Sequence, residues 1–150
     1  MNSAAEARFR VQAPNAGPRA VTAIALDAAG EALLRRLAGA GWTDATFLTA
    51  SASDALSDLA GHRRNVADEV DTADLVVFVA GPGGEAHGAA IIGAACSRRR
   101  VMTTGFLVGV AAASDDALSK TLAQLRPWSL MVVIANSDDY IDDMLTALRA

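Results

Sequence analysis

The 150-residue sequence has few of the residues on which disulfide-bonded, metal-binding and nucleic-acid-binding proteins depend. Its single cysteine, Cys96, excludes an internal disulfide, and two histidines far apart in sequence make a poor metal site. Its 13 basic residues are outnumbered by 17 acidic ones, and the net charge of -4 disfavours contact with nucleic-acid phosphates. We therefore expect no bound metal and no nucleic-acid partner.

Long hydrophobic runs are also missing. No run reaches about 18 apolar residues, the length that spans a bilayer. The first 18 residues are polar, contain Pro14 and Pro18, and lack the apolar core of a secretory signal. The expectation is a cytoplasmic protein without membrane contact, with residues 1–18 as a flexible tail and residues 19–150 as one domain.

Hydrophobic residues make up 52% of the sequence, and short apolar runs alternate with segments of helical spacing, a pattern typical of βαβ units. Strands are predicted at residues 21–26, 45–50, 75–80, 101–108 and 130–135. The run over residues 75–80 is wholly apolar, as in a parallel strand covered on both faces. We therefore expect this strand in the middle of the sheet.

Helices are predicted at residues 30–40, 88–97, 114–125 and 137–148. Ser114 is placed to cap the third, which carries Leu118, Leu122 and Leu125 on one face. The polar segment 51–72 shows weak helical spacing near residues 55–59 and 66–70. Together the elements predict a single doubly wound α/β domain of three layers with a five-stranded, mainly parallel sheet.

Ligands of such sheets bind beyond the carboxyl ends of the strands. The richest loop there carries Gly81, Gly83, Gly84 and Gly88 between a strand and a helix. Backbone N–H groups and the positive helix end favour an anion in such a loop, because glycine leaves room for close approach. The alternative is that the glycines only make a tight turn and allow close packing, since no fixed Rossmann or P-loop string is present.

Three segments, in the same order, resemble the nucleotide-binding half of the tubulin and FtsZ family. They are residues 25–30 running on to 41 and 47–48, residues 73–90, and residues 125–126 with 130–136. The resemblance covers residues 20–145 and implies a Rossmann-like domain that binds a guanine nucleotide with magnesium. It implies the following site residues: Asp27, Ala28, Ala29, Gly30, Gly81, Gly83, Gly84, Glu85, His87, Gly88 and Asn136.

The sequence departs from the family where phosphate and guanine would bind. Asp27 and Glu85 bring carboxylates to the phosphate loops, and Ala32 stands where the family has an asparagine for the base. The family's second domain, with the acidic loop that completes hydrolysis, is not found. We therefore expect a stand-alone relative that does not hydrolyse GTP by the family's mechanism.

Three functions remain open. The first is a non-hydrolysing module that holds a nucleotide or other small ligand at its glycine loops and acts in assembly or regulation, by self-association or with another protein. The second is a small-molecule enzyme with His87 as acid or base, assisted by Asp27 or Glu85. The third is a structural subunit whose pocket is filled by its own side chains.

Several residues also have a simpler interpretation. Asp27 is placed as a helix cap as well as a base or metal ligand, and His87 as an exposed loop residue. Cys96 is expected in the core. Arg63 and Arg64 either reach an acidic ligand or partner or are solvated, and no G-x-S-x-G string presents a serine nucleophile.

Overall fold

The computed structural model describes residues 19–50, 55–84, 86–135 and 139–148. The expected tail over residues 1–18 lies outside these ranges, as do two of the expected site residues, Glu85 and Asn136. Within the described ranges, seven strands form one mixed sheet in the order β4-β3-β2-β1-β5-β6-β7. The prediction of an α/β fold is confirmed.

All five predicted strands are present and pair in parallel. They are β1 (Val21–Ala25), β2 (Ala45–Ala50), β5 (Leu75–Ala80), β6 (Met102–Leu107) and β7 (Met131–Ile134). β5 lies between β1 and β6, and its residues from Val76 to Ala80 are buried. The prediction that this strand belongs inside the sheet is confirmed.

The prediction of five strands is wrong because a short hairpin extends the sheet beyond β2. β3 (Leu56–Asp58) and β4 (Arg63–Arg64) are antiparallel, so the weak helix expected near residues 55–59 is absent. The Asp58 carboxylate accepts hydrogen bonds from the backbone of Ala60 and His62 and closes the turn. Local turn chemistry therefore overrides the weak helical spacing.

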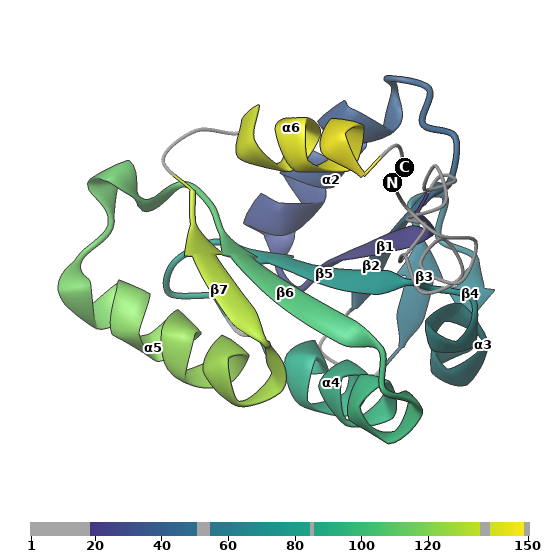
Figure 1. Cartoon of the computed structure of the whole chain (residues 1–150). Coiled ribbons are helices and arrows are strands. Elements are labelled where there is room, and N and C mark those ends of the chain that lie inside the picture. Colours follow the sequence, from purple (N-terminus) through teal and green to yellow (C-terminus); the bar gives the residue numbers. More distant parts are fainter. Residues whose placement is uncertain (1–18, 51–54, 85, 136–138, 149–150) are drawn as a thin grey trace, which may run out of the picture.

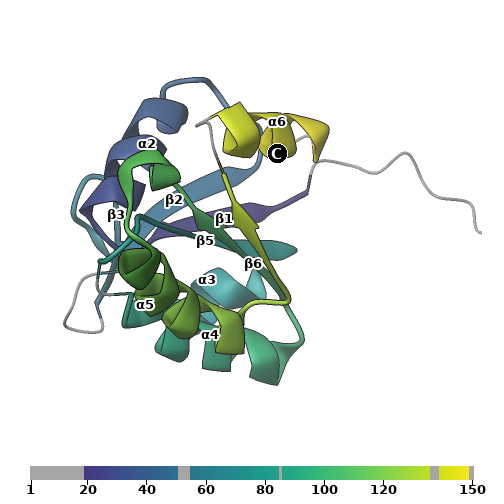
Figure 2. The same ribbon diagram turned by 90° about the vertical axis from the view of Figure 1, so that its left-hand side faces the viewer.

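Five α-helices lie within the described residues and cover both faces of the sheet. They are α2 (Ala28–Ala38), α3 (Val66–Asp71), α4 (Gly88–Arg99), α5 (Asp115–Leu125) and α6 (Asp139–Ala147). Figures 1 and 2 show α2 and α6 together on one face and α3, α4 and α5 on the other. Ser114 caps α5 as predicted, by accepting a hydrogen bond from the backbone of Ala117.

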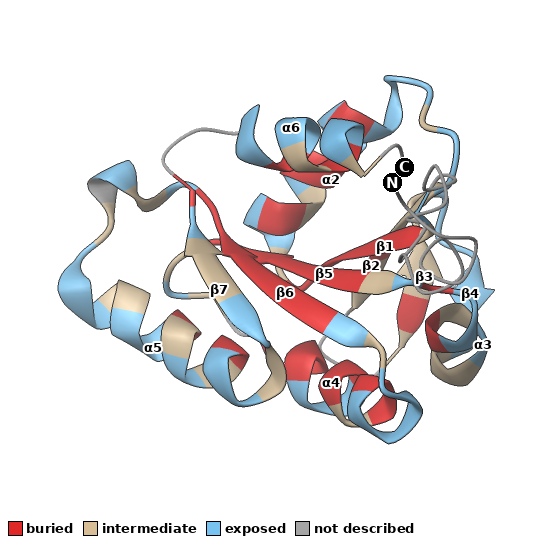
Figure 3. Ribbon diagram, in the orientation of Figure 1, coloured by how far each residue is buried: buried red, intermediate tan, exposed pale blue. Residues whose placement is uncertain are grey.

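Side chains of the central strands alternate between two buried clusters, one under each helical layer. In β5, Val77 and Val79 pack with α2 and α6, whereas Val76 and Phe78 pack with α4 and α5. Figure 3 shows the central strands buried and β7 only partly so. Cys96 lies in the core as predicted, and burial raises the pKa of its thiol to about 11.

Candidate functional site

The first two glycine-bearing loops meet because β1 and β5 are parallel neighbours whose carboxyl ends share one edge of the sheet. The first turn of α2 lies directly against the end of β5. A Cβ atom on Gly30 would lie 2.2 Å from the carbonyl oxygen of Val79, so only glycine fits there. The structure thus brings residues 27–30 and the loop after β5 together, as the sequence predicted.

Asp27 ties these two loops together through its carboxylate. Oδ1 accepts a hydrogen bond from the backbone N–H of Gly30 at 2.9 Å and caps α2. Oδ2 accepts one from the N–H of Gly81 at 2.8 Å, across 54 residues of sequence. Asp27 is therefore a helix cap. Its two carboxylate oxygens accept hydrogen bonds from the backbone N–H groups that the sequence suggested would bind a phosphate.

The glycines of the second loop allow the loops to pack without a gap. A Cβ atom on Gly84 would lie 2.4 Å from Asp27 Oδ2, and one on Gly81 would lie 2.7 Å from Ala29 Cβ. Gly88 is buried and would meet Ala50 Cβ at 2.8 Å. These distances support the close-packing interpretation of the glycines.

Helix α5 satisfies further donors of the same loop. Gly83 N–H donates to Thr121 Oγ1 at 2.9 Å, and Ala86 N–H donates to Gln124 Oε1 at 2.7 Å. The Thr121 hydroxyl is fully buried and donates in turn to the carbonyl oxygen of Gly81 at 3.3 Å. Four backbone N–H groups of the two loops therefore donate to side chains of the protein itself.

Sequence reasoning missed Thr121 and Gln124. It placed Leu118, Leu122 and Leu125 on one face of this helix, but only Leu125 of the three is buried. Thr121, four residues before Leu125, takes the second buried position of α5. The sequence offered one indication of a buried polar residue, namely that Thr121 lies one helical turn before Leu125. Its hydrogen-bond partner Gly81 is 40 residues away and could not be identified from the sequence.

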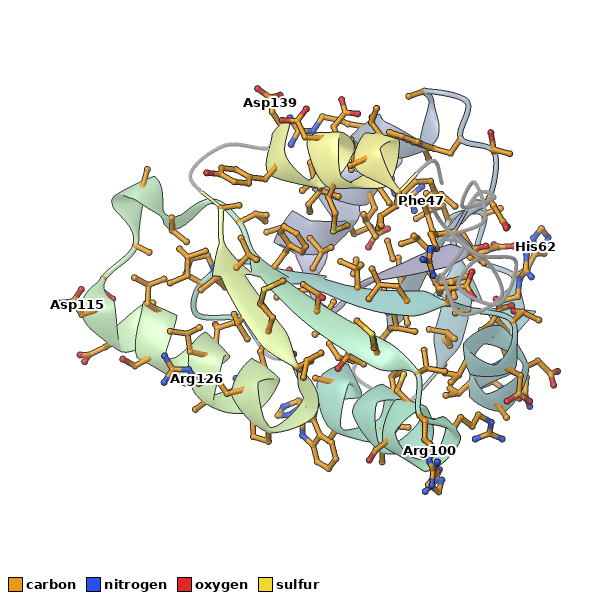
Figure 4. All side chains as sticks on the ribbon, in the orientation of Figure 1. Phe47, His62, Arg100, Asp115, Arg126 and Asp139 are labelled. Carbon is orange, nitrogen blue, oxygen red and sulfur yellow. The ribbon has the colours of Figure 1, made fainter. Side chains whose placement is uncertain are left out.

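The remaining site residues are spread around these loops. Ala28 and Ala29 form the exposed first turn of α2. His87 is exposed at the N-cap position of α4 and makes no side-chain cap hydrogen bond. The other histidine, His62 (Figure 4), lies in the β3–β4 hairpin, where its Nδ1 is 3.3 Å from Asp58 Oδ2. No group of three metal-ligating side chains occurs in the described part of the chain.

An open groove lies away from these loops. It has a volume of about 790 Å³ and lies between the β3–β4 hairpin and α4, with Arg63, Arg64, Arg98 and Arg99 in its walls. Arg64 pairs with Glu69 at 3.1 Å, and Arg99 pairs with Asp71. Two of these arginines thus serve surface ion pairs.

No protein-family model matches this chain, and no curated protein is significantly similar to it. Within the described ranges, no helix combines the length and the apolar character needed to cross a bilayer.

Proposed function

We propose that this chain is a non-hydrolysing binding or assembly module whose domain resembles the nucleotide-binding domain of the tubulin and FtsZ family. The supporting observation is that the Asp27 carboxylate accepts hydrogen bonds from both glycine loops, at Gly30 and Gly81. A carboxylate at a helix N-terminus satisfies the donors and the dipole that a phosphate would satisfy. The Asp27 carboxylate, which is a permanent part of the protein, thus takes the place of a ligand phosphate.

This replacement decides which ligands the loops favour. A nucleotide phosphate at the same donors must displace Asp27 and lie beside its negative charge, since Gly84 packs closely against Asp27 Oδ2, the oxygen that accepts from Gly81. Like charges about 4 Å apart repel by about 1 kcal/mol in water and by about 4 kcal/mol near a protein surface. Guanine nucleotides should therefore bind weakly and need magnesium to bridge the two anions, whereas uncharged or cationic ligands do not meet this barrier.

The test measures the thermal stability of three proteins with GTP and GDP, with and without magnesium. Asp27→Ser keeps a capping oxygen for Gly30 but empties the space toward Gly81, while Asp27→Asn removes the charge and keeps the volume. We expect the wild type to shift only with magnesium, and Asp27→Ser to shift more and without it, because a ligand that binds the native state raises its stability.

One control accompanies the shift measurement. Phosphate release from GTP should stay at background in all three proteins, since the proposed module does not hydrolyse it. If the wild type shifts as strongly with magnesium-free GDP as Asp27→Ser does, the carboxylate does not occupy the phosphate position and the proposal fails.

A small-molecule enzyme remains the second candidate, supported by the position of His87 at the N-cap of α4, beyond the carboxyl end of β5. Its expected helper Asp27 is committed to two backbone donors. A substrate screen with wild type and His87→Ala decides the matter, because an activity that survives the substitution removes His87 from the chemistry.

A further inference from the structure

The strand β7 ends the sheet without a neighbour on its outer side. On the inner side it pairs with β6. At its two ends, Leu130 N–H donates to the carbonyl oxygen of Thr103 at 2.9 Å, and Ala135 N–H donates to the carbonyl oxygen of Leu107 at 2.8 Å. Among the described residues, no strand pairs with the outer side. Figure 1 shows β7 as the outermost strand of the sheet at this rim.

The side chains of this edge are apolar and exposed. Leu130 is 74% exposed, Met131 56% and Ile134 46%, and the strand between them contains only Val132 and Val133. No charge, proline or glycine occurs in β7. Exposed edge strands of soluble proteins normally carry such features, because unpaired backbone groups bind other strands.

The opposite edge of the same sheet is protected in this way. β4 has two residues, Arg63 and Arg64, and both are exposed. Two neighbouring charges on a very short strand disfavour pairing with another chain. β7 has no charged residue, so this charge-based protection is missing at its edge.

A shallow groove runs beside this edge, toward α5. It has a volume of about 250 Å³ and is lined mainly by apolar residues: Leu122, Arg126, Ser129, Leu130, Met131, Val132 and Ile134. Arg126, labelled in Figure 4, lies at the end of α5 next to β7. Side chains of an added strand on this face of the sheet would therefore contact both apolar side chains and the polar groups of Arg126 and Ser129.

We propose that two copies of this chain associate through β7, paired antiparallel about a twofold axis that passes between Val132 and the partner's Val132. This pairing sets Met131 opposite the partner's Val133 and Leu130 opposite the partner's Ile134. Every cross-strand pair is then apolar and no like charges meet. The two sheets become continuous, with seven described strands from each copy.

The proposal names the surface for the self-association that the proposed function includes, but it rests on the strand edge and not on the glycine loops. A four-residue strand with a shallow groove is smaller than a standard interface, which buries about 800 Å² on each partner. We therefore expect a reversible dimer that forms in the micromolar concentration range.

Sedimentation velocity of the whole chain over a concentration series tests the pairing and its register. The double variant Leu130→Lys with Ile134→Lys places like charges opposite each other in both outer pairs, and should weaken association at least tenfold. The double variant Leu130→Lys with Ile134→Glu places opposite charges in the same pairs, and should restore the dimer. Ile91→Lys, a single lysine at an exposed residue of α4, should leave the dimer unchanged.

Circular dichroism of each variant confirms that it is folded. A wild type that is monomeric at every concentration overturns the proposal, as does a dimer that survives the double-lysine change or that the lysine–glutamate variant fails to restore. The nucleotide response of the Asp27 variants is measured separately. A failed interface therefore leaves the test of the proposed function intact.

Discussion

The glycine loops and the outer edge of β7 treat their backbone hydrogen-bonding groups in opposite ways. In the loops, the N–H groups of Gly30 and Gly81 donate to Asp27, and that of Gly83 donates to Thr121. Along β7, the outer backbone groups have no strand partner among the described residues. The loops that resemble a ligand site therefore have these donors satisfied within the protein, whereas the edge of β7, where backbone groups have no strand partner, carries no sequence motif. Changes in the loops should therefore reduce stability, and changes at the edge should reduce association.

The largest loss of stability is expected for Gly30→Ala. The added methyl group would lie 2.2 Å from the carbonyl oxygen of Val79, a backbone atom of a central strand that cannot move aside. We expect the free energy of unfolding to fall by about 3 kcal/mol or more, because overpacking against fixed atoms exceeds the gain in helix propensity. Urea denaturation measures the change.

Gly39→Ala is the matched control at the other end of the same helix. Its nearest neighbour would be the Arg36 carbonyl oxygen at 3.8 Å, which is ordinary contact. The substitution should change stability by less than about 0.5 kcal/mol, as surface changes usually do. Equal losses at the two glycines would show that the contact between α2 and β5 is looser than the structure has it.

Removing the Asp27 carboxylate should have the next largest effect. Asp27→Ala leaves the N–H groups of Gly30 and Gly81 without their acceptor, and hydrogen bonds to charged groups contribute about 1.5–3 kcal/mol each. Because the site is partly exposed and water replaces some of the loss, we expect about 2–3 kcal/mol in urea denaturation.

A double-mutant cycle with Gly84→Ala separates this loop contact from a general loss of helix capping. A methyl group on Gly84 would lie 2.4 Å from Asp27 Oδ2, so it should be costly in the wild type and much cheaper once Asp27 is alanine. Simple additivity of the two changes would mean that the loops do not meet through this carboxylate.

Thr121→Val is expected to have a smaller effect on the same region. It removes the fully buried hydroxyl that accepts from Gly83 and donates to Gly81 while keeping the side-chain volume. Gly83 N–H keeps a contact with the Ala117 carbonyl at 3.2 Å, so the loss should be about 1–2 kcal/mol by urea denaturation. Thr121→Ser, which retains the hydroxyl, should recover the hydrogen-bonding part of this loss.

The sequence was a good guide where the physics is local. The unbroken apolar run of β5 predicted an inner strand, and Ser114 predicted the start of α5. The β3–β4 hairpin was missed, because its strands have three and two residues and depend on a turn closed by Asp58. Strands that short leave no period-two pattern to read.

The sequence predicted where the glycine loops lie, but not whether their backbone donors are already satisfied. It placed residues 27–30 and the loop after β5 at the same edge of the sheet, where the pairing of β1 with β5 brings them together, and it predicted a carboxylate near any bound phosphate. Nothing local shows that Asp27 reaches Gly81 or that Gln124 reaches Ala86, since these pairs are 54 and 38 residues apart. Whether a loop is open or already occupied depends on such distant partners.

The smallest effect on stability is expected at the open edge, where Leu130→Lys with Ile134→Lys should change the unfolding free energy of the isolated chain by less than about 0.5 kcal/mol. The two side chains are 74% and 46% exposed, and their flexible replacements can extend into solvent. Urea denaturation at a protein concentration too low for dimers to form measures the unfolding free energy of the monomer without a contribution from association. A large loss of unfolding free energy would mean that the two side chains contribute to the core of the monomer. The edge of β7 would then be needed for stability, as the glycine loops are, and not for association.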